Sequence, residues 1–389
     1  MLDPILEGLT ALPHRSSTTA AEKKAADFLA QELKKLGLAV TVEPFTAATT
    51  FSWIYFILYG GFALAIGVHY FFPPFGFLIA VLLTVLFVAE QLTWWSPLSY
   101  LVPRGPSQNV LGRLEPETGE NLLILVAHYD TSKTALAFAP GTVKYLRPLF
   151  LVSLFMIVTT LLCLAADYLA LLNRQTWTAL DLFLLAPLLY FLYGAGLMVE
   201  REVRGQPVQG AADNASGVAV AVELASRVKE AGGLSGWKVW LLLTGCEEVG
   251  MAGMSAFLKT HGRELDKTKT VFLNFDNLGD GRITYVTGEG MLKKLPADPA
   301  LVRLAEEIAK EEPFEDVQGR AFNALTLDTL VPRARGFRVL SFMSLNEDGV
   351  PWPWHWHDDV LTNVDREDLD RAAEFAWTLI QRLAQKPSA

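Results

Sequence analysis

The sequence predicts an α/β fold: a mostly parallel, mixed sheet sandwiched by helices, plus four transmembrane helices in two inserted hairpins. Three observations support this. Fully apolar strand-length runs alternate with helical segments, chemically active residues follow several of these runs, and four apolar stretches are long enough to cross a bilayer. The chain has 389 residues, of which 51% are hydrophobic, and a net charge of −9, which argues against nucleic acid as a partner.

The segments outside the apolar stretches alternate between strand and helix patterns. Residues 18–36 have helical apolar spacing and stop at Gly37, and residues 38–45 alternate like a strand. Further strands are predicted at 121–127, 238–244, 271–275, 283–286 and 337–342, and further helices at 215–229, 252–259, 299–311 and 366–384. Apolar strands separated by helices indicate a parallel sheet covered on both faces, whose ligands collect at the carboxyl ends of the strands.

The four apolar stretches predict two transmembrane hairpins. They span residues 53–72, 75–95, 146–164 and 179–199, and each approaches the ~20 residues that cross a bilayer. Pro73-Pro74 is expected to make the first turn, and a polar tip around Asn173 and Arg174 the second. Buried core helices are the alternative, but these usually run shorter and are more amphipathic. The expected division is one domain from residues 1–50, 106–140 and 205–389, with hairpins at 51–105 and 141–204.

Charge near the hairpins predicts their orientation. The hairpin bases carry Arg104, Lys144, Arg147, Arg201 and Arg204, whereas the tips offer only Arg174. Positive residues favour the cytoplasmic side, so the large domain is expected in the cytoplasm of a multi-pass membrane protein. The opening residues show no signal-peptide pattern, and the two cysteines demand no oxidising compartment. Anchoring in the lipid bilayer is the simplest role for the hairpins; positioning the site for membrane-released peptides and homo-oligomer contacts are the alternatives.

Five segments carry residues that suit a metal site. They contain His128 in AHYD, Asp213 in GAADNASG, Glu248 in TGCEEVG, Asp276 in NFDNLG and His355 in WHWHDD. Two imidazoles and three carboxylates can hold two cations that share one carboxylate, which is equipment for metal-assisted hydrolysis. Taken singly, most have ordinary alternatives: a surface histidine, a helix N-cap, a solvated acidic turn and a turn-capping aspartate, in the order of the first four.

Two further residues, Asp130 and Glu247, complete the expected site. Asp130 lies two positions after His128, a spacing that lets one strand end supply a ligand and the carboxylate that orients it. The adjacent Glu247 and Glu248 suggest a division of roles, with Glu248 as ligand and Glu247 as general base. His357 competes with His355, and the residues alone leave open which of the two binds metal.

Together these segments resemble the co-catalytic di-zinc aminopeptidase family, which includes bacterial leucyl aminopeptidase and is related to glutaminyl cyclase and the transferrin receptor. The likeness covers about residues 1–50, 106–140 and 205–389 and begins with LPHRSSTTAAEKKAADFLAQELKKLGLAVTVEPF. It implies a zinc-exopeptidase-like fold, a peptide substrate and two Zn²⁺ per chain. It also implies a role for each residue, as follows: His128 and Asp276 on one zinc, Glu248 on the other, Asp213 on both, Asp130 as orienter and Glu247 as base.

The last ligand follows from the same resemblance. The family's terminal motif has an Asp four residues after the His and another Asp ten residues after it. Asp359 and Asp365 fit this spacing from His355 and not from His357, so the resemblance implies His355.

The chain departs from the family in two places. The family usually has an Asp-His pair ahead of a Gly-hydrophobic-Pro strand, whereas here Asp328-Thr329 precedes Gly336-Phe337-Arg338. The Thr that normally follows the late Asp is Val360. The missing His implies different substrate contacts at that point.

The expected function is that of a membrane-anchored, zinc-dependent aminopeptidase that hydrolyses N-terminal peptide bonds with a water activated by two metals. One alternative is transfer of the glutaminyl-cyclase type at a single zinc. Another is a non-catalytic membrane receptor or scaffold on the same fold. A complete ligand set favours hydrolysis over both.

Overall fold

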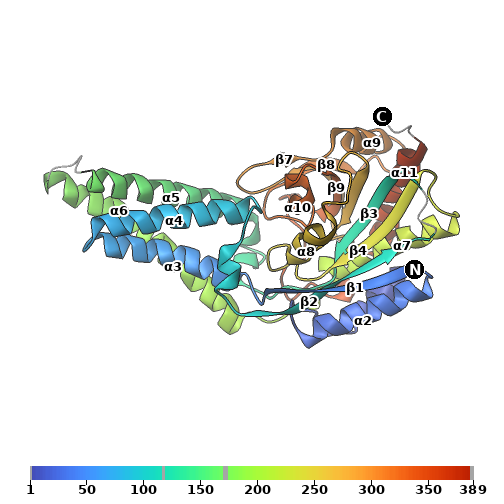
Figure 1. Ribbon diagram of the computed structural model, residues 1–389, viewed down its shortest axis with the longest axis horizontal. Coiled ribbons are helices and arrows are strands. Elements are labelled where there is room, and N and C mark those ends of the chain that lie inside the picture. The colour runs from blue at the N-terminus through green and yellow to red at the C-terminus, as the bar shows by residue number, and fades with distance from the viewer. Residues whose placement is uncertain (1, 116–118, 170–173, 386–389) are drawn as a thin grey trace. The chain divides into compact units, whose positions relative to one another are not determined.

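The computed structural model describes residues 2–115, 119–169 and 174–385, and the chain divides into two compact units (Figure 1). The sheet unit consists of Met1–Thr49, Arg104–Thr134 and Gln206–Ala389, and the helical unit of Thr50–Pro103 and Ala135–Gly205. Asn173, which the sequence placed in a polar tip, lies outside the described residues.

A mixed sheet forms the centre of the sheet unit. Its strands are β1 (Ala39–Ala48), β2 (Arg104–Arg113), β3 (Asn121–His128), β4 (Trp237–Thr244), β5 (Thr270–Phe275), β6 (Arg282–Glu289), β7 (Leu295–Pro296), β8 (Gln318–Phe322) and β9 (Arg338–Leu345). Their order is β1-β2-β4-β3-β5-β9-β6-β7, with β8 paired to β6. The four central strands β4, β3, β5 and β9 run parallel, while β2 and β6 flank them in antiparallel pairs. The predicted α/β class with a mixed sheet is confirmed; its central strands are parallel, and its outer pairings are mainly antiparallel.

The register of the central strands brings their carboxyl ends together. His128 at the end of β3 lies opposite Thr244 at the end of β4. On the other side of β3, Val126 lies opposite Asn274, near the end of β5. Residues that follow these three strands therefore emerge at one edge of the sheet.

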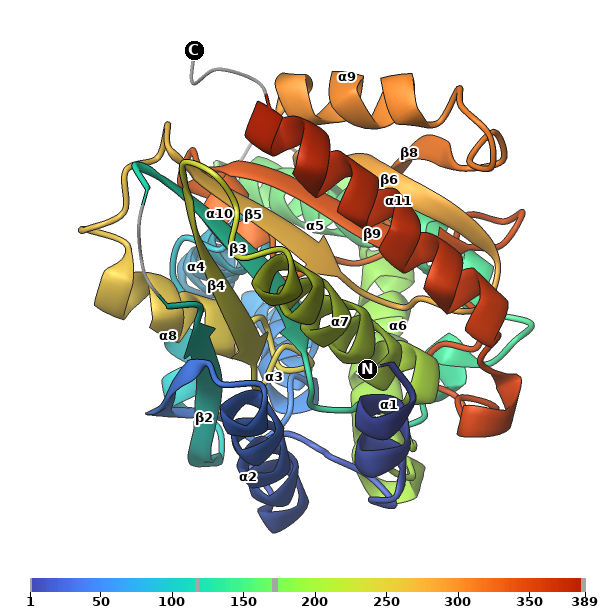
Figure 2. The ribbon, with the colours of Figure 1, turned by 90° about the vertical axis from the view of Figure 1, so that its right-hand side faces the viewer.

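Helices cover both faces of the sheet (Figure 2). Side chains of β3 alternate between two cores: Leu123 and Leu125 belong to one, Leu122 and Ile124 to the other. The first core is closed by α1 (Leu2–Thr10), α2 (Ala20–Lys35), α7 (Gly217–Glu230), α9 (Pro299–Ile308) and α11 (Arg366–Gln385), and the second by α8 (Ala252–His261) and α10 (Leu330–Ala334). Short helical turns are η1 (Pro97–Tyr100), η2 (Leu136–Phe138), η3 (Val143–Tyr145), η4 (Ala211–Ser216, a π-type turn) and η5 (Leu361–Asn363).

The start of α2 places an acid inside the sheet unit. Thr19 caps the helix by accepting a hydrogen bond from the backbone N–H of Glu22, and Glu22 Oε2 accepts one from the backbone N–H of Thr18 at 2.7 Å. This reciprocal capping fixes the first turn. Glu22 is fully buried as a result.

The helical unit is built from four long apolar helices. They are α3 (Ser52–His69), α4 (Pro73–Gln91), α5 (Leu146–Tyr168) and α6 (Arg174–Arg204). Each of α3 and α5 packs against both α4 and α6. The first turn differs from the expectation: it lies before the double proline, and Pro73 and Pro74 begin α4. Proline suits the first turn of a helix, because the N–H that it lacks has no partner there.

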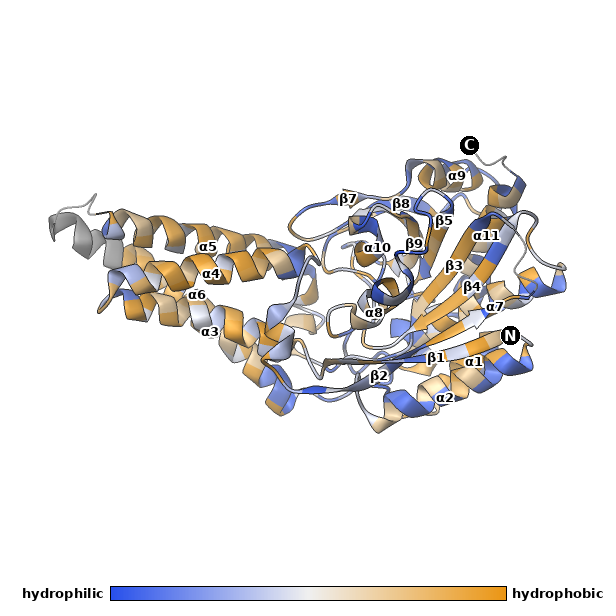
Figure 3. Ribbon diagram, in the orientation of Figure 1, coloured by the Kyte–Doolittle hydropathy of each residue, from blue (hydrophilic) through white to orange (hydrophobic). Residues whose placement is uncertain are grey.

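Hydrophobic residues predominate along the four helices of the helical unit (Figure 3). Four stretches are long and apolar enough to cross a membrane, and only 22% to 44% of each is buried. Inside the bundle, Phe62 stacks on Phe191 with ring centroids 4.9 Å apart, and Ser153 Oγ lies 2.6 Å from the Tyr190 hydroxyl. Aromatic and polar side chains thus pack inside the bundle, while many other apolar side chains are exposed on its outside.

Candidate metal centre

Three strand ends supply four of the predicted site residues. His128 is the last residue of β3, Asp276 directly follows β5, and Glu247 and Glu248 lie in the turn after β4. Cys246, just before the glutamates, has a φ of 55°. This left-handed conformation turns the chain sharply at the strand end.

Asp213 approaches the same edge from η4. The turn is held close to β5, because Asn214 Nδ2 donates to the carbonyl of Phe275 at 2.9 Å. Gly217 is required here, since a Cβ at that position would lie 2.2 Å from Asn214 Oδ1 and 2.3 Å from the Phe275 carbonyl oxygen. Asp359 fixes Asp213 itself: its carboxylate accepts from the backbone N–H groups of Ala212 at 2.7 Å and of Asp213 at 3.3 Å.

The five predicted ligands form two buried clusters that share Asp213. In the first, Nε2 of His128 lies 3.1 Å from Asp213 Oδ1 and 3.6 Å from Asp276 Oδ1. In the second, Nε2 of His355 lies 3.0 Å from Asp213 Oδ2 and 3.1 Å from Glu248 Oε1. The ligand atoms of each cluster lie within 4.8 Å of one another. Each Asp213 oxygen therefore faces a different imidazole.

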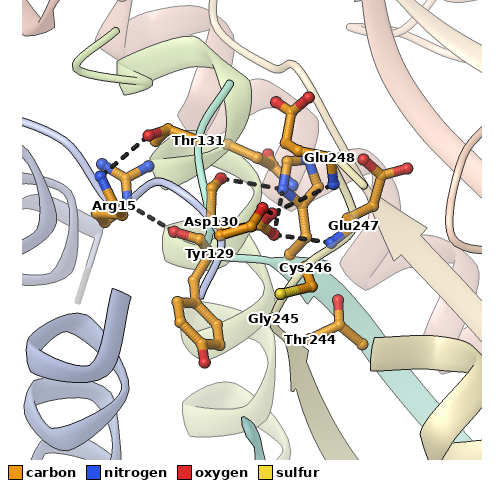
Figure 4. Close-up of polar contacts among 12 residues, drawn as sticks. Arg15, Tyr129, Asp130, Thr131, Thr244, Gly245, Cys246, Glu247 and Glu248 are labelled. Carbon is orange, nitrogen blue, oxygen red and sulfur yellow. Dashed lines mark hydrogen bonds and ion pairs between the residues drawn. The ribbon is translucent and has the colours of Figure 1, made fainter. Parts of the chain in front are cut away.

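Asp130 holds the turn that carries Glu247 and Glu248 (Figure 4). Its Oδ1 accepts from the backbone N–H of Glu247 at 2.9 Å, and its Oδ2 from that of Glu248 at 3.2 Å and from the Ser17 hydroxyl at 2.7 Å. Its contact with the predicted partner is longer, since His128 Nδ1 lies 3.5 Å from Asp130 Oδ1 and 3.2 Å from the Asp130 carbonyl oxygen. Positioning the Glu247–Glu248 turn is thus a role that the sequence did not suggest.

The structure separates the two candidate histidines. His355 is buried among the acids, with a left-handed φ of 48°, whereas His357 is exposed and belongs to neither cluster. Trp354 is buried against Phe322, with ring centroids 6.0 Å apart, and its own ring lies 5.2 Å from that of His355. An aromatic wall therefore borders the second cluster.

Residues 198–380 match the family model of Peptidase family M28. The chain carries an M28 peptidase domain. The matched range contains Asp213, Glu247, Glu248, Asp276 and His355, while His128 precedes it. No curated protein matches the chain.

Several solved structures share the fold of this chain. A zinc aminopeptidase from Bacillus subtilis has a TM-score of 0.57 at 14% identity, covering 98% of this chain and 94% of its own. A Zn-dependent exopeptidase from Parabacteroides distasonis has a TM-score of 0.56 at 15% identity, covering 98% and 96%. A glutaminyl cyclase from Bacteroides thetaiotaomicron bound to N-acetylhistamine has a TM-score of 0.58 at 14% identity, covering 98% and 96%. The chain therefore has the fold that these zinc peptidases and glutaminyl cyclases share.

Charge within the M28 site is strongly negative. Burial acts to raise the pKa of Asp213, but hydrogen bonds to His128 and His355 lower it well below its ordinary value. Burial lowers the pKa of His355, but the charge of Glu248 and the hydrogen bond with Asp213 raise it to about 9. The pKa of His128 is likewise raised well above its ordinary value, because burial is outweighed by the charge of Asp276 and by hydrogen bonds to neighbouring carboxylates.

The general-base candidate has the electrostatics of a proton acceptor. Burial raises the pKa of Glu247 well above its ordinary range; the charge of His128 lowers it, while Asp328 and Asp276 raise it further. A carboxylate with a raised pKa holds a proton more readily near neutral pH. Its side chain extends with that of Glu248 from the turn anchored on Asp130 (Figure 4).

The donor set fits zinc. Imidazole nitrogen and carboxylate oxygen are the usual zinc ligands in catalytic sites, and both clusters combine one imidazole with two carboxylates. Two bound cations would balance the charge of the buried carboxylates and would be coordinated by the Nε2 atoms of His128 and His355.

Several functional neighbours were not found from the sequence. Arg15 and Glu22 are fully buried beside the site, and Glu22 Oε1 accepts from the backbone N–H of Cys246 at 3.2 Å. Thr329, where the family has a His, is buried and donates to Glu289 Oε1 at 2.9 Å. Position 329 therefore contributes to the interior of this M28 domain.

The only sequence signal for Glu22 was its place in a helix-capping pattern, and such a pattern does not indicate that the side chain is buried.

Proposed function

We propose that the chain is a membrane-anchored M28 aminopeptidase that uses two zinc ions. The observation that supports this most strongly is the position of Asp213, whose two carboxylate oxygens face two different imidazole-carboxylate pairs at 3.0 and 3.1 Å. A carboxylate shared in this way suits a pair of cations better than a single one. His128 and Asp276 would complete one site, and Glu248 and His355 the other.

Zinc bound at these residues would supply Lewis acidity and increase the acidity of a water molecule next to a peptide carbonyl. The other steps belong to the chain. Glu247 accepts the proton from the attacking water and passes it to the leaving amine, and its raised pKa suits it to both transfers. Asp130 holds the Glu247 backbone, and Asp359 holds that of Asp213, so both carboxylates are positioned before substrate arrives.

Exopeptidase action on the amino terminus is part of the proposal, because a zinc aminopeptidase shares the fold of this chain.

The helical unit is proposed to anchor the enzyme in the bilayer. Leu64, Leu82 and Leu162 are more than half exposed along the bundle, as expected for side chains that contact lipid. Exposed aromatic residues at both ends of the first hairpin support this, because tryptophan and tyrosine are enriched at membrane interfaces. Trp94 is 72% exposed near the hairpin base, and Tyr70 is 53% exposed at the first turn. Helix α5, with 23 residues, is about 35 Å long at about 1.5 Å per residue, enough to span the apolar core.

A cytoplasmic sheet unit is part of the proposal. Lys144, Arg147 and Arg204 lie at the hairpin bases that lead to this unit. Arg201 is less informative than the sequence suggests, because it is buried and donates to Ser52 Oγ at 3.0 Å. The remaining cations still favour the cytoplasmic side for the bases.

Cyclisation of the glutaminyl-cyclase type is the competing function, because two such cyclases share the fold. Substrate turnover distinguishes the two. The purified chain, stripped with a chelator and reloaded with zinc, is expected to release free amine from a panel of aminoacyl amides. A chain that cyclised N-terminal glutamine and released no amino acid would overturn the peptidase proposal.

A further inference from the structure

Arg15 is a buried cation placed between the two chain segments that carry His128 and Asp213. It lies in the segment between α1 and α2, outside the residues that match the M28 family model, and is fully buried. A guanidinium removed from water requires partners for its donors and a balancing negative charge. Arg15 has both.

The donors of Arg15 contact backbone carbonyls on both sides of the site. Nε donates to the Tyr129 carbonyl at 2.6 Å, next to His128. Nη1 donates to the Gln209 carbonyl at 2.7 Å, and Nη2 to the Gly210 carbonyl at 2.8 Å. These last two residues lead directly into η4, which carries Asp213. One planar group thus spans the ends of two segments that are about 80 positions apart in the sequence.

The backbone of the same residue adds to this connection. The Arg15 N–H donates to Thr131 Oγ1 at 3.0 Å, and the Thr131 N–H donates to the Arg15 carbonyl at 3.3 Å. Gly210 has a φ of 69°, and a Cβ there would lie 2.3 Å from Thr131 Cγ2 and 3.0 Å from Arg15 Nη2. The two segments are therefore packed too closely for a larger residue at position 210.

The charge of Arg15 is balanced by the site. The carboxylates of Asp359, Asp130, Asp213 and Glu248 all act on its guanidinium. Among the described residues none of these carboxylates forms a direct ion pair with Arg15, so the attraction is spread over the acidic cluster. The positive charge of Arg15 offsets the electrostatic repulsion among these carboxylates. The hydrogen bonds from its guanidinium to backbone carbonyls fix the positions of the segments that carry them.

We infer that Arg15 is a positioning residue of the metal centre: its guanidinium fixes the distance between the His128 and Asp213 segments. The inference rests on the proposed two-zinc function for the identity of the metal. Lysine cannot replace the planar group, because one ammonium cannot reach three carbonyls in the geometry of a fork. Arg15 touches neither of the two ligand clusters directly and acts through the backbone.

The test measures zinc affinity, by competition with a chromophoric chelator, on the full chain in detergent micelles. Arg15→Gly should lower zinc affinity by about 10- to 100-fold, the usual cost of losing a residue that orients metal ligands. Methylguanidinium, at concentrations that leave the wild-type melting temperature unchanged, should restore part of this loss. Arg335→Met is the matched control, because it removes a half-buried guanidinium that donates to the Val331 carbonyl away from the site. It should leave zinc affinity unchanged.

Arg15→Lys covers the case in which the glycine variant does not fold; its affinity should fall between those of wild type and Arg15→Gly. Wild-type zinc affinity in either folded Arg15 variant would overturn the inference, as would a lower melting temperature with no change in affinity. A wild-type chain that bound zinc but hydrolysed nothing would overturn the proposed peptidase and leave the role of Arg15 intact. A wild-type chain that bound no zinc would overturn both.

Discussion

Replacing Glu247 with glutamine is the sharpest perturbation of the proposed chemistry. Glutamine keeps the shape of the side chain and removes its ability to accept a proton. The backbone contact with Asp130 at 2.9 Å does not depend on the side chain, and Glu247 belongs to neither ligand cluster. Zinc content and the folded turn should therefore be preserved in Glu247→Gln.

The expected loss of turnover follows from the role of a general base. Proton transfer by a positioned group contributes roughly 100- to 10,000-fold, which corresponds to about 3 to 5 kcal/mol of activation free energy. The melting temperature of the metal-free chain should stay the same or rise. Burial and neighbouring acids raise the pKa of Glu247, which shows that its ionised form is disfavoured in the fold.

The assay compares kcat and bound zinc for wild type, Glu247→Gln and Glu264→Gln on an aminoacyl amide. Glu264 is exposed, so its substitution controls for the loss of one surface carboxylate. A large fall in kcat with unchanged zinc content is the expected result for Glu247→Gln alone. A zinc-loaded Glu247→Gln enzyme with kcat within about tenfold of wild type would refute the assignment.

Three further outcomes follow from the structure. His355→Ala should lose about half of the bound zinc and His357→Ala none, as measured by elemental analysis; equal losses would contradict the separation of the two rings. Burial, together with the charge of Asp130, raises the pKa of Glu22 to about 8. The Glu22 carboxyl therefore holds a proton more tightly in the folded state than in the unfolded state. Between pH 4.5 and about 8, the metal-free chain should lose stability as pH rises. Glu22→Gln should flatten that decline in melting temperature, and an identical slope would show that Glu22 is not its source. A reporter fused to the carboxyl terminus should give a signal from the cytoplasmic side of the membrane. A signal from the opposite side would contradict the proposed topology.

The sequence predicted the elements that local pattern determines. Strands β3, β4 and β5 are continuous apolar runs buried on both faces, which made both their existence and the position of polar residues after them predictable. The apolar helices of the helical unit were predictable for the same reason. Strand β2 was not predicted, because Gly105 and Pro106 interrupt its pattern and its pairing with β1 is what makes it a strand.

The supporting groups of the site depend on distant contacts and were therefore missed. Glu22 meets Cys246, 224 positions away, and Arg15 meets Gly210, 195 positions away. Neither residue differs locally from an ordinary surface charge. The resemblance implied Asp359 as part of a motif, but only the structure shows that it holds the backbone of Asp213.

Quantitative metal analysis of the purified chain tests the shared-carboxylate site most directly. Wild type should bind two zinc ions per chain, and Asp213→Asn should lose affinity for both, because each oxygen of Asp213 faces a different cluster. A single tightly bound ion in wild type, or an Asp213→Asn chain that still bound two, would contradict the two-metal centre.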